Sequence, residues 1–319
     1  MKFSVKAFIA GVILSALFVC VKNIYSCELT AAAGRGVLCV MKKGSLDNLY
    51  IGSSMFRQGI TLYNDDSDSF LLCYNGLDPA AESLILEHLF RNGLALKNLY
   101  ADMYAYSAVR EPGLSDSRLM FDSPLELKFA LWDKSVRNSE GYISDSWEFF
   151  VKAGNDMFML WPVYNMLTAK RYYRGGYSAD DFRRGLTPAE MKLRKPPEPE
   201  AVKMNPSQKE AVIRIIELCR EYNVNLIFTE TPKYEVIADN AEYNSLMNEY
   251  VSLLNDYGVK CIISRGTLNN INAGDRENIY PYDFPCGDAS MFQDYVHLST
   301  NGSRKFMNVL RETQKVDGM

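Results

Sequence analysis

The chain has 319 residues, of which 47% are hydrophobic and 12% aromatic, so it can bury a sizeable core and is neither disordered nor fibrous. Its formal net charge is only −4. Nucleic acid is not an expected partner, because the sequence carries no basic stripe that could neutralise phosphates. The length accommodates one large α/β domain or two small ones.

The cysteines and histidines do not form the pattern of a metal site. Seven cysteines are spread along the chain without a CxxC pair, and only two histidines are present. Structural zinc needs four such ligands at short spacings. We therefore expect no metal and no other cofactor. The odd number of cysteines also argues against a disulfide framework, although it leaves one bridge open.

The N-terminus carries a short apolar segment. Lys2 and Lys6 precede an uncharged run at 7–21, which is shorter than the roughly 20 residues that cross a bilayer comfortably. This length is typical of a signal-peptide core or a short signal anchor. We favour an uncleaved anchor over 1–27, although cleavage near Ala31–Ala33 and lipidation at Cys27 stay open. Positive flanking charge then predicts a single-pass cell-membrane protein with its body outside the cytoplasm.

Apolar runs alternate with helical patterns through most of the remaining chain, 28–319. Such alternation predicts βαβ units and a doubly wound parallel sheet covered by helices, a three-layer α/β sandwich. The predicted strands lie at 48–54, 69–75, 97–106, 224–231 and 259–264. The first predicted helix lies at 79–92, with Asp78 as its N-cap, and the second follows the capping segment 205–207 and runs to about residue 222. The others lie at 240–257 and before about residue 312.

The region from about 110 to 204 interrupts this alternation. Helical patterns at 123–136 and 146–172 are followed by a loose, proline-containing connection, so we interpret the region as a helical insertion. An insertion between the third and fourth strands leaves the sheet at its carboxyl edge, where a site is expected. Its aromatic rings either line a groove for a sugar polymer or hold helices together; they are Trp132, Trp147, Trp161, Tyr164, Tyr172 and Tyr173.

Three residues make up a candidate catalytic set. A serine hydrolase needs a hydroxyl nucleophile, a base and a carboxylate that orients the base. Ser54 follows the first strand, and His297 lies in the loop before the last helix, three residues after Asp294. The pair could also simply belong to the helix entry. The other histidine, His88, lies in the middle of a predicted helix and is interpreted as a satisfied helical residue.

Two segments resemble the first and last sequence blocks of the SGNH (GDSL-type) hydrolases, namely LYIGSSMFRQG and DYVHLSTNGSRKF. The resemblance places Ser54 at the nucleophile position and Asp294 and His297 at the acid and base positions. Asn75-Gly76 is similar to the second block. The resemblance therefore implies an oxyanion hole formed by the N–H groups of Ser54 and Gly76, with Asn75 as a substitute donor. It extends in chain order over 48–312.

The sequence departs from the family pattern in two places. Ser53 stands where the family usually has aspartate, a variant that resembles the membrane-anchored branch around DltD and the alginate O-acetylation proteins. The third block, Gly-x-Asn-Asp, is absent, because Ala101–Tyr104 stand in its place. Gly154–Asp156 matches its letters but lies in the insertion, and we interpret that match as coincidence.

The resemblance implies an extracytoplasmic serine esterase or O-acyltransferase that acts on acyl or acetyl esters of a cell-envelope polysaccharide. A multi-spanning membrane O-acyltransferase is the partner that it implies. The missing third block supports a second hypothesis, in which the chain is a non-catalytic scaffold or polysaccharide-binding component of an envelope acylation complex. A third hypothesis, a solute-binding or structural α/β protein, requires all three motif matches to be accidental.

Overall fold

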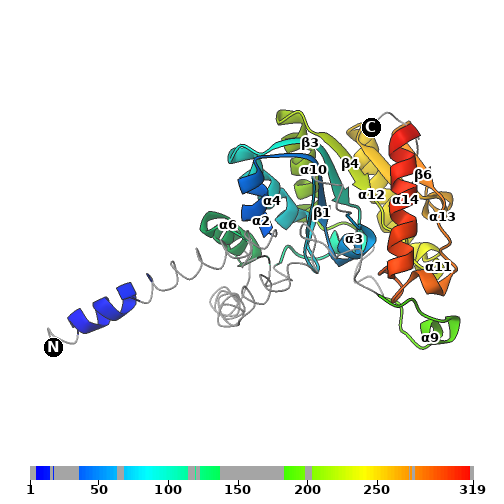
Figure 1. Cartoon of the computed structure of the whole chain (residues 1–319), viewed down its shortest axis with the longest axis horizontal. Coiled ribbons are helices and arrows are strands. Elements are labelled where there is room, and N and C mark those ends of the chain that lie inside the picture. Colours follow the sequence, from blue (N-terminus) through cyan, green and yellow to red (C-terminus); the bar gives the residue numbers. More distant parts are fainter. Residues whose placement is uncertain are drawn as a thin grey trace.

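The computed structural model describes residues 5–14, 17, 36–62, 68–113, 119, 123–136, 183–197, 203–272, 274 and 277–316. Six parallel strands form one sheet in the order β2-β1-β3-β4-β5-β6 (Figure 1). Helices pack against it, so the predicted α/β class with a parallel sheet is confirmed. The order makes the sheet doubly wound, because the chain runs from β1 to one edge and then returns past β1 to build the other half.

The strands are β1 Ser45–Gly52, β2 Ser69–Cys73, β3 Ala95–Asp102, β4 Asn225–Thr229, β5 Lys260–Ser264 and β6 Ile279–Tyr282. The first five correspond to the five predicted strands. The third ends earlier than predicted, because the chain turns into the short helix η1 Ala105–Ser107. The sixth was missed, since it has four residues and contains Pro281. A proline is tolerated there because β6 is an edge strand.

Two helices between strands begin where their caps predict. Asp78 caps α4 Pro79–Arg91, and Asn205 caps α10 Pro206–Glu221. In each helix the side chain of the cap accepts a backbone N–H, and proline occupies the first helical position. The others are α2 Gly36–Lys43, α3 Ser54–Gly59, α6 Leu125–Val136, α9 Pro188–Lys192, α11 Glu235–Ala238, α12 Ala241–Asp256, α13 Arg265–Asn270 and α14 Thr300–Val316, with η4 Ala289–Met291.

Parallel connections are normally right-handed, and for this strand order that handedness places α4, α10 and α12 on one face of the sheet and α3 and α14 on the other. In agreement with this, α4 packs against α10 and α3 packs against α14 (Figure 1). A row of asparagines pins the register of the central strands. The Asn98 amide donates to Asn48 Oδ1 at 3.1 Å, and the Asn225 amide donates to Asn98 Oδ1 at 2.9 Å. A shift of one strand by a residue would break this row.

Much of the predicted insertion lies outside the described residues. Helix α6 confirms the helical pattern at 123–136, and Trp132 on it packs, half-buried, against the core. The predicted helix at 146–172 and the Gly154–Asp156 match lie outside the described residues, as do Trp147, Trp161, Tyr164, Tyr172 and Tyr173. The cap and its sugar groove therefore stay predictions.

Residues 5–14 form a helix with exposed apolar side chains, drawn in blue in Figure 1. Phe8 is 73% exposed and Leu14 is 66% exposed. No helix within the described ranges is both long and apolar enough to cross a membrane. The rest of the run at 7–21, apart from Leu17, lies outside those ranges, as do Cys27 and Ala31–Ala33. The anchor over 1–27 accordingly stays a prediction.

Candidate active site

The candidate site lies at the carboxyl end of β1, beside the point where the strand order reverses. Ligands of doubly wound sheets bind at such switch points. Strand β1 ends at Gly52, and Ser53 is the N-cap of α3, so Ser54 is the first residue of that helix. A Cβ atom at Gly52 would lie 2.3 Å from the Cβ atom of Asp102 on β3. Only glycine therefore lets the two strand ends approach so closely.

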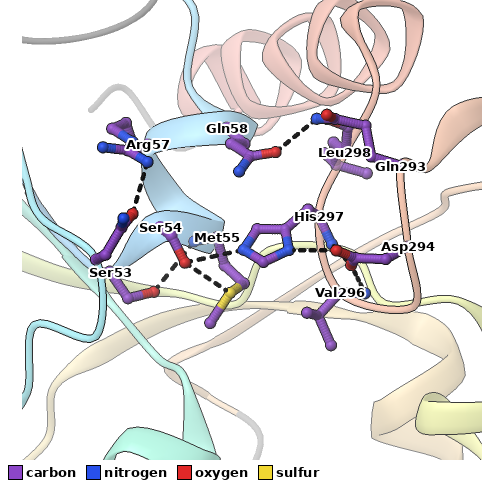
Figure 2. Close-up of polar contacts among 11 residues, drawn as sticks. Ser53, Ser54, Met55, Arg57, Gln58, Gln293, Asp294, Val296, His297 and Leu298 are labelled. Carbon is purple, nitrogen blue, oxygen red and sulfur yellow. Dashed lines mark hydrogen bonds and ion pairs between the residues drawn. The ribbon is translucent and has the colours of Figure 1, made fainter. Parts of the chain in front are cut away.

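The structure brings Ser54, His297 and Asp294 together in one chain of hydrogen bonds. Ser54 Oγ lies 2.8 Å from His297 Nε2, and His297 Nδ1 lies 2.7 Å from Asp294 Oδ2 (Figure 2). His297 and Asp294 keep 21% and 32% of their side-chain surface exposed. A substrate from solvent can therefore reach the imidazole, and this is the arrangement of nucleophile, base and orienting acid that a serine hydrolase requires.

The Asp-x-x-His spacing has a local structural reason. Asp294 Oδ1 accepts the backbone N–H groups of Val296 and His297 at 2.9 and 2.8 Å, which folds the segment into a tight turn. Asp294 Oδ2 is thereby left to face the imidazole. An isolated bridge between Phe292 and Leu298 closes the loop on both sides of the turn. One carboxylate thus shapes the loop and orients the histidine.

These contacts also decide the charge of Asp294. Burial alone would raise the pKa of Asp294, but the hydrogen bond to His297, the His297 charge and the two backbone N–H groups lower this pKa below its ordinary value. Asp294 therefore stays ionised at neutral pH. An ionised carboxylate at this place favours the tautomer of His297 that carries its proton on Nδ1 and leaves Nε2 free to accept one from Ser54.

Side-chain contacts tie the histidine loop to the nucleophile helix. Gln293 Nε2 donates to Gln58 Oε1 at 2.5 Å and to the Leu298 carbonyl at 2.7 Å (Figure 2). Ser303, in the first turn of α14, donates to the Gly59 carbonyl at 3.0 Å. Because Ser54 and His297 are 243 residues apart in sequence, such contacts between α3 and α14 are what holds their side chains within bonding distance.

Two of the predicted oxyanion residues, Asn75 and Gly76, lie in the turn after β2, next to the end of β1. The Tyr74 N–H donates to the Gly52 carbonyl at 3.0 Å, and Gly76 has a φ of 63°, which favours glycine. Asn75 Oδ1 accepts a hydrogen bond from Arg57 Nη2 at 2.6 Å. Donation by Ser54, Gly76 and Asn75 to an oxyanion stays a prediction.

Sequence reasoning missed a set of buried charges behind the nucleophile. Asp102 ends β3, and its Oδ2 accepts the N–H of Ser53 at 3.1 Å and the Ser53 hydroxyl at 2.5 Å. Glu230 and Lys233 follow β4, and both are completely or almost completely buried. The available signal was their place in the sequence, because charged residues directly after buried parallel strands gather at the edge where sites form.

Burial is the largest cause of the pKa shifts of Asp102, Glu230 and Lys233. It raises the pKa of Asp102, and the Lys233 charge and the two Ser53 hydrogen bonds only partly offset this rise. Burial also raises the pKa of Glu230, although Tyr243, Ser264 and Thr267 all donate to its carboxylate. The pKa of Lys233 is lowered by burial and partly restored by Asp102 and Glu230. The three charges therefore depend on one another.

A hollow of about 400 Å³ adjoins the histidine loop. Arg194, Lys195 and Pro197 line one side of it, and the segment 294–296 lines the other. The Tyr295 hydroxyl donates to the carbonyls of Met191 and Arg194 at 3.0 and 3.1 Å, which fixes the end of α9 against this loop. Of the three triad residues, only Asp294 lines this hollow.

His88 lies within α4 and is buried. Its Nδ1 faces Glu126 at 3.9 Å, and its carbonyl accepts the Asn92 amide at 2.8 Å.

In the described part of the chain no three His, Cys, Asp or Glu side chains are grouped so that they could hold a metal ion. Comparison of the chain with protein-family models and with curated proteins returned no match.

Proposed function

We propose that this chain is a serine esterase or O-acyltransferase of the SGNH type. The observation that carries the proposal is the continuous hydrogen-bond chain from Ser54 Oγ through His297 to Asp294 at the carboxyl edge of a doubly wound sheet. Support also comes from the chain order of the three residues and from the turn at Asn75-Gly76 beside the nucleophile. Chance loop residues rarely combine a nucleophile, a base and an oriented acid with such distances.

In the proposed reaction, Ser54 Oγ attacks an ester carbonyl while His297 Nε2 takes the hydroxyl proton. The negative charge that develops on the carbonyl oxygen is stabilised by the backbone N–H groups of Ser54 and Gly76. Protonated His297 then gives its proton to the leaving alcohol, and an acyl-serine remains. Water or an acceptor hydroxyl attacks this ester with His297 again as base, which restores Ser54. Asp294 stabilises the imidazolium in both halves.

We further propose that the protein is anchored in the cell membrane by its N-terminal segment and acts outside the cytoplasm. The exposed apolar helix at 5–14 supports this placement. Acyl or acetyl esters of a cell-envelope polysaccharide are the proposed substrate, and a multi-spanning membrane O-acyltransferase is the proposed partner. Both follow from the family resemblance. Attack on the acyl-serine by water would make the protein an esterase, and attack by a sugar hydroxyl would make it an acyltransferase.

A second candidate function is a non-catalytic scaffold in an envelope acylation complex. One observation favours it. The segment Ala101–Tyr104 stands where the family has Gly-x-Asn-Asp, so buried Met103 occupies the position of the asparagine that donates to the oxyanion. Loss of one such donor costs about 3 kcal/mol of transition-state stabilisation, so it slows a reaction without removing an active triad.

A fluorophosphonate probe tests whether Ser54 is an activated nucleophile, because the probe reacts with activated serines and needs no knowledge of the substrate. We expect stoichiometric labelling at Ser54 and loss of labelling by at least about 10³-fold in Ser54→Ala and His297→Gln. Peptide mass spectrometry identifies the labelled residue, and progress curves give the rate constant.

The second histidine supplies a matched control. His88→Gln makes the same chemical change in the buried α4 helix and should label at the wild-type rate. Thermal unfolding of every variant shows whether the fold is kept. Absence of labelling in the folded wild-type chain would reject the enzyme in favour of the scaffold, and labelling at another serine would reject Ser54 as the nucleophile.

A further inference from the structure

The residue before the nucleophile is held more firmly than an ordinary helix cap. The backbone N–H and the hydroxyl of Ser53 both donate to the same oxygen, Asp102 Oδ2, at 3.1 and 2.5 Å. The Ser53 hydroxyl oxygen also accepts the N–H of Met55 at 3.3 Å. Ser53 is 1% exposed and Asp102 is 4% exposed, so solvent does not compete for these bonds.

We propose that Asp102 is a positioning residue for the nucleophile, which acts by fixing Ser53 and thereby the backbone that carries Ser54. This inference rests on the proposed function, since it assigns a partner to the same nucleophile. The carboxylate comes from β3, across the switch point, whereas Ser53 lies next to the nucleophile in sequence. The hydrogen bonds between Ser53 and Asp102 therefore link the ends of β1 and β3, and the sequence around Ser54 alone does not reveal them.

The direction of the hydrogen bonds explains why a carboxylate is needed. A carboxylate only accepts, so it draws the Ser53 hydroxyl hydrogen toward β3 and leaves an oxygen lone pair for the Met55 N–H. That donation fixes the first turn of α3, which carries Ser54 toward His297. Charged acceptors also make shorter and stronger bonds than neutral ones. An asparagine at this place would present either a weaker acceptor or a competing donor.

Lys233 compensates the buried carboxylate. Asp102 Oδ1 has no hydrogen-bond partner among the described residues, so the Ser53 hydrogen bonds stabilise only one of the two carboxylate oxygens. Lys233 is 1% exposed and interacts electrostatically with Asp102. Other titratable groups face this pair; they are Cys73, Glu82, Tyr104, Tyr250 and His297 around Asp102, and Glu230, Cys286 and Asp294 around Lys233.

A double-mutant cycle on the rate of fluorophosphonate labelling tests the inference. We expect Ser53→Ala and Asp102→Asn each to slow labelling by about tenfold to about a hundredfold, because the nucleophile is displaced from its base. The double variant should label no more slowly than the slower single variant, since both changes remove one restraint. Ser53→Thr, which keeps the hydroxyl, should label at close to the wild-type rate.

Ser83→Ala is the matched control for Ser53→Ala. It removes another buried serine hydroxyl, which lies on α4 and donates to the Ala80 carbonyl at 2.8 Å instead of to Asp102. Its labelling rate should stay within about twofold of wild type. Thermal unfolding temperatures of all variants separate a loss of stability from a loss of nucleophile alignment. If Asp102→Asn does not fold, the contrast between Ser53→Ala and Ser53→Thr still decides the role of the hydroxyl.

The outcomes separate the two proposals. Wild-type labelling at Ser54 with unchanged rates in Ser53→Ala and Asp102→Asn would overturn the positioning role and leave the enzyme intact. Independent, multiplying losses in the double variant would also overturn it, because Asp102 would then act by a route other than Ser53. A folded wild-type chain that is not labelled would reject the proposed function and the positioning role with it.

Discussion

The pKa values of half-buried Asp294 and buried Glu82 are shifted in opposite directions, and the groups around each carboxylate explain the direction. Asp294 is hydrogen-bonded by an imidazole and two backbone N–H groups, and its pKa is lowered even though burial acts to raise it. Glu82, on α4, is buried near the acids Asp102 and Asp78, and its pKa is raised well above the ordinary value by burial first and by these charges second. An ionised carboxylate thus stabilises the fold at Asp294 and destabilises it at Glu82.

Replacing Glu82 with glutamine should stabilise the protein at neutral pH. A carboxyl group whose pKa is higher in the folded than in the unfolded state contributes stability below its unfolded pKa, and this contribution is lost as the pH rises through the folded pKa. Glutamine has nearly the same shape and carries no charge. We therefore expect a higher thermal unfolding temperature for Glu82→Gln near pH 8, with a gain that shrinks as the pH falls toward about 4. Differential scanning calorimetry across this range checks it, and a gain that does not depend on pH contradicts it.

At the scale of elements, the site depends on close contact between α14 and the segment that precedes it. A Cβ atom at Gly302, in the first turn of α14, would lie 2.0 Å from the carbonyl oxygen of Met291 at the end of η4. The Ser299 N–H donates to the same carbonyl at 2.9 Å. Because the Asp294–His297 turn lies between η4 and α14, the spacing of these two elements determines where the imidazole sits.

Gly302→Ala should therefore displace the imidazole of His297, although Gly302 is not one of the three triad residues. The added methyl group meets backbone, which must shift, so we expect a loss of about 1–3 kcal/mol in unfolding free energy and slower labelling of Ser54. Urea unfolding and the fluorophosphonate rate measure the two effects. Gly266→Ala is a suitable comparison, because a Cβ atom there meets nothing closer than 3.5 Å and should leave the labelling rate unchanged. A normal labelling rate in Gly302→Ala would show that the loop tolerates the shift.

Across the whole molecule, the parallel sheet collects polar groups from distant parts of the sequence at one edge. Ser54 follows β1, Asp102 ends β3, Lys233 follows β4 and His297 precedes α14. Parallel connections make this unavoidable, because every strand ends at the same side of the sheet. Contacts between α3 and α14 then hold the histidine loop next to Ser54.

The N-terminal segment is expected to anchor the protein in a membrane. We predict that the full-length chain sediments with the membrane fraction after expression in cells and resists extraction with alkaline carbonate. Ile9→Arg combined with Ile13→Arg should move the protein to the soluble fraction, since each arginine costs about 2.5 to 3.5 kcal/mol in the middle of a membrane helix. Labelling of Ser54 should be retained in this variant. Recovery of the wild-type chain in the soluble fraction would contradict the anchor but not the active site.

Much of the fold was predictable because its signals are local. The apolar runs of five strands, the Asp78 and Asn205 caps and the Asp-x-x-His turn each depend on residues close together in the sequence. Strand β6 was missed, because four residues with a proline carry too little pattern to distinguish an edge strand from a loop.

The sequence by itself determined the class of the fold and the candidate triad of Ser54, His297 and Asp294, since hydrophobic periodicity and the order of the sequence blocks can be recognised without the structure. Only the tertiary structure decided that Asp102 holds Ser53, that Lys233 lies buried among acids, and that Gln293 reaches Gln58. These contacts join segments separated by 49 to 235 residues. Their physical cause is the close approach of strand ends and helices, which lets a polar side chain replace water with a protein partner, and no local pattern records which partner that will be.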